Sequence, residues 1–231
     1  MDSGGLLSRR ATPQDDDIVS AVYPHMGYDA VGIGHQEFIN GIGYFKKNLN
    51  GKLPFVSSNL TFQDEDIVFE KYRIITTASG IRVGVTSVNY NTSFRYLMRT
   101  DAVKEDEIIV GRAFDELRPV LNDLKEVSDI IVVMAHLNHE AIVRLLDEVD
   151  GYDIVIGGNN LPHFKYARKV NGKIQVQNGR DGERIGKAVF NRDMTGKMKF
   201  ESYELIEILA RARGYARDKK IDKLIIEQEN R

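Results

Sequence analysis

The chain has 231 residues, of which 42% are hydrophobic, a net charge of −2 and no cysteine. A chain of this length and composition can bury one substantial core. The absence of a basic surplus argues against a general nucleic-acid binder, and the lack of cysteine excludes disulfides, thiolate metal sites and a cysteine nucleophile. No apolar run is long enough to span a bilayer.

The first elements are a helix and a strand. Thr12 is a typical N-cap residue, and an acidic first turn complements the dipole of a helix that we expect from Pro13 to about His25. A strand from Tyr28 to Ile33 then leads into the turn Gly34-His35-Gln36-Glu37-Phe38. A strand that runs into a glycine turn and a helix is where α/β proteins bind ligands.

The next stretch predicts a helix, a short strand and a hairpin. Apolar residues recur at helical spacing from Phe38 to Leu49, and a short strand is expected at 55–60. Residues 72–77 and 81–88 read as the two strands of a β-hairpin. Residues 89–108 are polar and irregular, so we expect a functional loop or an ordered excursion.

Buried strands alternate with helices in the following part. Residues 113–124 form an amphipathic pattern with Pro119 inside it, which predicts a kink. The apolar run 130–135 ends at His136 and suits a strand buried on both faces. The later elements are a helix over 141–149 capped by Asn138, a strand at 154–156, hairpins at 164–177 and 187–203, and a long charged helix from Leu205 onward.

Three of these strands end in polar turns, which contain Gly34-His35, His136 and Gly158-Asn159. The carboxyl ends of parallel strands lie at one edge of a sheet. We therefore expect these three turns to meet, and they form the constellation that predicts a site.

Several segments match the motifs of one family in the same order. Residues 28–41 are similar to an Asp-Ala-(apolar)-x-x-Gly-Asn-His-Glu-Phe-Asp-x-Gly motif, 56–60 to a Ser-Ala-Asn-Leu strand, and 133–137 to Leu-Ser-His-Leu. Residues 152–158 match the strand before a Gly-His-x-His motif, and 179–186 a later glycine-spaced turn; Asp2-Ser3-Gly4 is similar to part of Asp-Ala-Gly-Asp. Residues 1–206 thus resemble the calcineurin-like metallophosphoesterases, and within them the 5′-nucleotidase branch.

The resemblance implies an α/β (α+β) fold, a four-layer α/β/β/α sandwich with a two-metal site at the strand ends. Such a site lowers the pKa of a bridging water and clamps the phosphate during in-line attack. Its ligands are hard oxygens and imidazoles, including a carboxylate that bridges both ions. The family's first motif, an Asp-x-His on the opening strand, has no counterpart here, so we expect the fold to lack that strand.

Most catalytic positions of the family carry other residues. Gly5 stands at the bridging Asp, His35 at an Asn ligand, and Gln36 at the His that stabilises the leaving group or transition state. Ile39 replaces the partner Asp of that His. Asn159 and Leu161 occupy the two His positions of the Gly-His-x-His motif, whereas His136 keeps its family identity.

The candidate metal ligands are therefore His136, His35 and Asn159, and no catalytic or substrate-binding residue is assigned. Each has a structural alternative: His136 as a hydrogen-bonded residue at a strand end, and His35 as a residue that fills vacated space. We expect a structural role for Glu37 in the turn. His139 and His163 lie near motif positions but out of register.

Two functions remain open. The favoured interpretation is a degenerate 5′-nucleotidase-like domain, a pseudoenzyme without two-metal catalysis that acts in binding or assembly. The alternative is a metal-dependent phosphoesterase or 5′-nucleotidase that hydrolyses nucleotides or other phosphate esters at a remodelled site. That site would use His35, His136 and Asn159, with Mn, Zn or Fe as the divalent ion.

The missing strand predicts an open sheet edge that a protein partner or a second copy covers; no nucleic-acid polymer and no membrane span is expected. Residues 207–231 are predicted to form a charged helix for linking or docking, with no second nucleotidase domain after it. By resemblance, the protein is expected to be extracytoplasmic or periplasmic if a signal lies upstream of Met1, and otherwise cytoplasmic.

Overall fold

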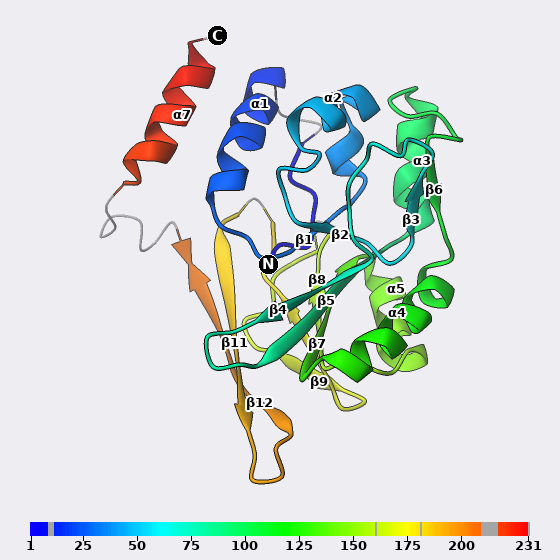
Figure 1. Cartoon of the computed structure of the whole chain (residues 1–231), viewed down its shortest axis with the longest axis vertical. Coiled ribbons are helices and arrows are strands. Elements are labelled where there is room, and N and C mark those ends of the chain that lie inside the picture. The colour runs from blue at the N-terminus through cyan, green and yellow to red at the C-terminus, as the bar shows by residue number, and fades with distance from the viewer. Residues whose placement is uncertain (9–11, 160, 181, 209–216, 231) are drawn as a thin grey trace.

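A six-stranded sheet forms the centre of the computed structural model, which describes residues 1–8, 12–159, 161–180, 182–208 and 217–230. Its order is β4-β5-β7-β8-β10-β9 (Figure 1). Strands β5, β7, β8 and β10 run parallel, and β4 and β9 pair antiparallel at the two edges. The strands are β4 (Tyr72–Thr76), β5 (Arg82–Asn89), β7 (Ile130–His136), β8 (Ile154–Gly157), β9 (Arg168–Val170) and β10 (Lys173–Gln177).

Two helices cover one face of this sheet. They are α4 (Ala113–Val127) and α5 (His139–Glu148), and their apolar sides join one buried cluster with the central strands. Leu121 and Leu145 meet Val133 and Val155 in that cluster. All seven residues of β7 are buried, as the continuous apolar run predicts for a strand covered on both faces.

Two separate strand pairs cover the other face. The pair of β1 (Val31–Gly32) and β2 (Phe55–Val56) is parallel, and that of β11 (Arg184–Arg192) and β12 (Met198–Glu207) is antiparallel. Val56 of the first pair and Phe200 of the second belong to one apolar cluster with the central sheet. In the described part of the chain, no ladder joins β11 to any strand except β12. Whether an open edge results from the missing strand, and what covers it, stays a prediction.

The fourth layer consists of helices and a short sheet. The helices are α1 (Pro13–Val22), α2 (Gly41–Asn48) and α3 (Asn91–Arg99), with the 3₁₀ turns η1 (Tyr23–His25) and η2 (Gln36–Phe38). Strands β3 (Leu60–Phe62) and β6 (Ile108–Val110) pair antiparallel beside them. Phe38, Phe45 and Phe94 pack beneath these elements against β1 and β2. The four-layer α/β/β/α order that the resemblance implies is confirmed.

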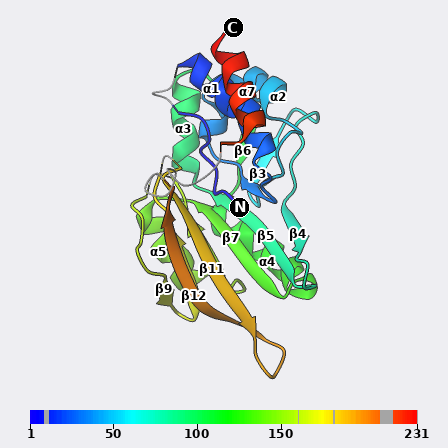
Figure 2. The same ribbon diagram turned by 90° about the vertical axis from the view of Figure 1, so that its left-hand side faces the viewer.

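The last helix, α7 (Lys219–Glu229), lies beside α1 (Figures 1 and 2). The Gln14 side chain of α1 donates to the carbonyls of Gln228 at 3.3 Å and Glu229 at 3.0 Å. None of the helices among the described residues is long and apolar enough to cross a membrane.

Residues 89–108 are not an irregular loop, because they contain α3. Phe94 and Leu97 are three positions apart, so one helix face buries both of them. Because polar residues lie between them, this short apolar stripe was not recognised in the sequence. The strand expected over 28–33 is also shorter, since only Val31–Gly32 pair with β2.

The single long helix expected from Leu205 is wrong. Strand β12 continues to Glu207, and α7 begins only at Lys219, where the Asp218 carboxylate caps the helix by accepting from the N–H of Lys220 at 2.9 Å. Residues 209–216 of the expected helix lie outside the described residues. Helix α4 runs unbroken through Pro119, which lies on its exposed side. The division into 1–206 and 207–231 stays a prediction.

Removal of the Phe45 ring is expected to lower the free energy of unfolding by about 3 to 5 kcal/mol, because the cavity left in the core collapses only in part. The ring is fully buried, with its centroid 4.6 Å from that of Phe38 and 5.5 Å from that of Phe55. Urea unfolding of Phe45→Ala measures the loss. The exposed Val143→Ala is the control, and an equal loss in both variants would contradict the assignment of this core.

Candidate functional site

The turn that follows β1 carries the first candidate residues. Phe38 ends η2 and is buried among the aromatic rings of the fourth layer, so it anchors the turn from one side. Asn89, at the end of β5, anchors it from the other side, because its Nδ2 donates to the carbonyl of Ile33 at 2.8 Å. Packing and backbone hydrogen bonding therefore fix the direction of the turn before any ligand is considered.

Glu37 joins this turn to the N-terminal segment. Its carboxylate is fully buried; one oxygen accepts from the N–H groups of Gly5 at 2.6 Å and Leu6 at 2.7 Å, and the other from that of Gly34 at 2.8 Å. Burial raises the pKa of Glu37, and these backbone hydrogen bonds oppose the rise. The structural role expected for Glu37 thus has a geometric basis.

His35 and His136 are in direct contact. His35 Nδ1 lies 3.0 Å from His136 Nε2, and both side chains are buried. Burial, and then the nearby charge of His35, lowers the pKa of His136 to about 3, while the backbone of Ser3 acts in the opposite direction. His136 is therefore a neutral imidazole near pH 7, and its Nδ1 has no hydrogen-bond partner among the described residues.

Two glycines, Gly5 and Gly34, lie against this histidine pair. A Cβ atom on Gly5 would lie 2.5 Å from Gln36 Oε1 and 3.5 Å from His136 Cε1. A Cβ on Gly34 would lie 2.8 Å from His136 Cε1, so the imidazole occupies the space of a missing side chain. A side chain at position 5 would point into the site, which is where the resemblance places a bridging carboxylate. Glycine there contributes no ligand.

The third predicted turn adjoins the pair. The N–H of Gly158 donates to the carbonyl of Ala135 at 2.9 Å, so the turn after β8 lies against the end of β7. Asn159 follows in the left-handed region with φ of 60°. Leu161, at a His position of the family motif, instead packs against the apolar cluster under α4 and α5. His139 is the first residue of α5, and His163 lines a cleft farther along this edge.

The donor set does not fit a two-metal centre. Such a centre needs carboxylates to balance the charge of two cations, but both oxygens of Glu37 already accept backbone hydrogen bonds. Gln36 donates from Nε2 to the carbonyl of Leu7 at 3.0 Å. In the described ranges, no group of three His, Cys, Asp or Glu side chains is placed to hold a metal ion. The two imidazoles would supply at most two ligands to a single ion.

Two buried asparagines behind the site, Asn59 and Asn89, were not predicted from the sequence. Asn59 Nδ2 donates to the carbonyl of Asn89 at 2.9 Å, and its Oδ1 accepts from the N–H of Asn89 at 2.9 Å. These bonds tie the ends of β2 and β5 together. The available signal was a polar residue directly after the apolar strand 81–88, the same signal that pointed to His136.

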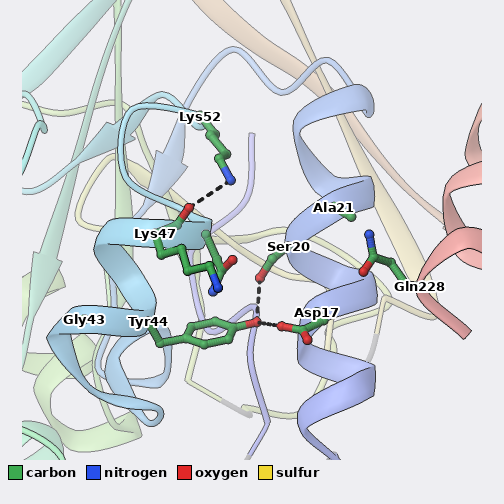
Figure 3. Close-up of a pocket in the computed structure, with 9 residues that line it drawn as sticks. Asp17, Ser20, Ala21, Gly43, Tyr44, Lys47, Lys52 and Gln228 are labelled. Atoms are coloured by element: carbon green, nitrogen blue, oxygen red, sulfur yellow. Dashed lines mark hydrogen bonds between the residues drawn. The ribbon is translucent and has the colours of Figure 1, made fainter. Parts of the chain in front are cut away.

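A cavity of about 500 Å³ lies between α1, α2 and α7 (Figure 3). Its polar groups largely bind one another: the Tyr44 hydroxyl lies 2.9 Å from Asp17 and 3.2 Å from Ser20, and Lys52 donates to the carbonyl of Lys47 at 3.1 Å. Burial raises the pKa of Tyr44 to about 12, so the phenol is not a base near neutral pH. We therefore assign no catalytic role to this cavity.

Comparison with known proteins gives a consistent relationship. No family model matches the chain. A 5′-nucleotidase from Bos taurus is 28% identical over 145 residues, a region that covers 58% of this chain and 24% of the relative. The chain thus matches about a quarter of that protein's length.

Solved structures extend the likeness over nearly the whole chain. Sulfate thiohydrolase SoxB from Thermus thermophilus has a TM-score of 0.77 at 15% identity and covers 98% of this chain and 41% of its own. A 5′-nucleotidase precursor, also from Thermus thermophilus, has a TM-score of 0.76 at 16% identity and covers 99% of this chain and 48% of its own. These structures show the shared fold. Together with the bovine relative, they confirm the resemblance that the motifs indicate.

Replacement of Glu37 by Gln is expected to lower the free energy of unfolding by about 2 kcal/mol. The amide keeps one acceptor oxygen and places an N–H₂ group against a backbone N–H that the carboxylate now binds. Chemical unfolding of Glu37→Gln measures the loss, with the exposed Glu65→Gln as control. Equal stability of the two variants would show that Glu37 does not hold the N-terminal segment.

Proposed function

We propose that this 5′-nucleotidase-like metallophosphoesterase domain acts in binding or assembly and does not perform two-metal phosphoester hydrolysis. The observation that carries the proposal is the contact of 3.0 Å between His35 and His136, at a site where the described residues form no cluster of three metal ligands and the Glu37 carboxylate is bound to backbone N–H groups. Each imidazole uses a nitrogen in this contact, and a hydrogen bond between them must break before both nitrogens can bind metal.

The chemistry of hydrolysis supports the same proposal. Two cations a few ångströms apart repel each other unless a bridging carboxylate lies between them; position 5 is a glycine. A proton donor to the leaving group must be able to change its protonation state, and Gln36 cannot. Ligand and orienting residues in such sites each contribute about 10- to 100-fold to metal affinity or activity. Several simultaneous losses therefore remove most of the rate advantage.

One observation favours the alternative of a remodelled hydrolase. Two imidazole nitrogens bound to one tetrahedral zinc at bond lengths of about 2.0 to 2.1 Å lie roughly 3.3 Å apart, and the His35–His136 separation of 3.0 Å is close to that value. A single ion held by His35, His136 and Asn159 would activate a water molecule. It would lack the second cation that clamps the phosphate.

Metal content and turnover, measured together, test the proposal. We expect the purified full chain to hold less than about 0.1 equivalent of Mn, Zn or Fe by elemental mass spectrometry, because two imidazoles without carboxylate ligands bind a divalent ion weakly. We also expect that Mn²⁺ gives no turnover of an aryl phosphate or a nucleoside monophosphate above a heat-denatured sample.

His136→Ala is the matched variant for both measurements, and His25→Ala, on the exposed turn after α1, is its control. Two tightly bound ions per chain would overturn the proposal. Turnover that His136→Ala abolishes and His25→Ala leaves intact would establish the single-ion hydrolase instead.

A further inference from the structure

Positive charge is concentrated in one segment of this acidic chain. Residues 161–184 contain six Lys or Arg and two Asp or Glu, a net charge of +4, whereas the remaining residues have a net charge of −6. The segment connects β8 to β11 through β9 and β10. Within the segment, Lys173 is paired with Asp150 at 2.9 Å and Arg184 with Glu183 at 2.6 Å.

A cleft lies within this segment. Its volume is about 460 Å³, and it is lined by Leu161, Pro162, His163, Gly179, Arg180, Glu183 and Arg184. Clefts of roughly 300 to 1,000 Å³ accommodate small molecules. The cleft adjoins the carboxyl end of β10, where α/β proteins place their ligands.

Backbone and side-chain hydrogen bonds fix the wall of the cleft. Gln177, the last residue of β10, donates from its side chain to the carbonyl of Pro162. The backbone N–H of Phe164 donates to the carbonyl of Gln177 at 2.8 Å. The loop 162–164 is thereby tied to the sheet, and the cleft is largely formed before a ligand arrives.

Arg184 supplies a positioned cation. Its side chain is only 18% exposed, and Nη1 lies 2.6 Å from Glu183 Oε2. Nε lies 3.7 Å from Glu207 Oε1, which makes a second ion pair but is beyond hydrogen-bond reach, and Nε has no hydrogen-bond partner among the described residues. The guanidinium is thus oriented by two carboxylates while it keeps an N–H group that is buried and makes no hydrogen bond. Such a group costs free energy until an acceptor reaches it.

Gly179 keeps this guanidinium accessible to the cleft. Its φ is +90°, and a Cβ atom there would lie 3.4 Å from Arg184 Nη1 and 3.3 Å from His163 Cβ. Any side chain at position 179 would therefore enter the space between the arginine and the histidine. Glycine satisfies both the backbone conformation and the need for that space.

We propose that this cleft binds a small anion through a phosphate or carboxylate group, with Arg184 and Arg180 as the recognition residues. Guanidinium groups bind both kinds of oxyanion through paired N–H donors. Because the proposal specifies the ligand of a binding domain, it rests on the proposed function. It is independent of the histidine pair, however, and a hydrolase could carry the same cleft.

Calorimetric titration of the full chain with inorganic phosphate, and separately with succinate, tests the cleft. We expect saturable binding of at least one anion with a Kd on the order of 1 mM, and the two titrations decide between phosphate and carboxylate chemistry. Arg180→Gln and Arg184→Gln are each expected to weaken binding about fivefold or more, because each removes a charged donor.

Arg168→Gln is the matched control. It removes one positive charge from the same segment, but Arg168 stacks over the Phe164 ring at 3.6 Å and does not line the cleft. It should change Kd less than about twofold, since its charge acts only at a distance. Circular dichroism checks the fold of Arg184→Gln, and the exposed Arg180→Gln provides the result if Arg184→Gln fails to fold.

Two results would overturn the proposal: no saturable binding of either anion up to about 20 mM, or an equal loss of affinity in Arg168→Gln and Arg180→Gln. The second result would mean that the anion responds to the general charge of the segment and not to the cleft. Neither result affects the metal and turnover measurements, so failure of this proposal is distinguishable from failure of the proposed function.

Discussion

The arrangement of the strand-end site depends on one buried carboxylate. Glu37 has no cation beside it in the described hydrogen bonds and ion pairs; three backbone N–H groups stabilise it, two from the N-terminal segment and one from the turn after β1. Burial of an acid is unfavourable unless donors of this kind surround it. The carboxylate therefore ties Gly5 and Leu6 to Gly34. Asp2 adds further backbone hydrogen bonds to Ala30 and Gly32, so the carboxylate and this bridge together position the N-terminal segment over His136.

The same constraint explains how the turn can keep its shape although its catalytic residues differ from those of the family. The interactions that hold it are the Glu37 carboxylate, the Phe38 ring and the Asn89 amide, and none of them uses a metal ion. Changes at positions 5, 36 and 161 therefore leave the supports of the turn in place. The buried His35–His136 pair occupies the centre that charged ligands would need. A site of this kind can lose its chemistry without losing its fold.

The sequence was most informative where one residue pattern corresponds to one structure. The apolar run 130–135, the Asn138 cap and the hairpin pattern within 164–177 are patterns of this kind, and the corresponding strands and helix are present in the structure. Helix α3 was missed because two buried apolar residues in a polar segment give a weak period. The contact between His35 and His136 follows from topology, but its distance depends on the glycines at 5 and 34 and on the rotamers that they permit. No local sequence pattern specifies this distance or these rotamers.

For a related reason, sequence patterns did not predict the geometry of the cleft. Arg180 precedes β11 and Arg184 is its first residue, and nothing in their spacing indicates that Pro162 and His163 line the same cleft. That contact arises because β10 inserts next to β8, which brings the loops after both strands to one edge. The histidine pair lies at the ends of β1 and β7 on the central part of that edge, and the cleft lies at the end of β10. The histidine pair and the cleft thus share one sheet edge but are supported by different strand ends, so each can change without the other.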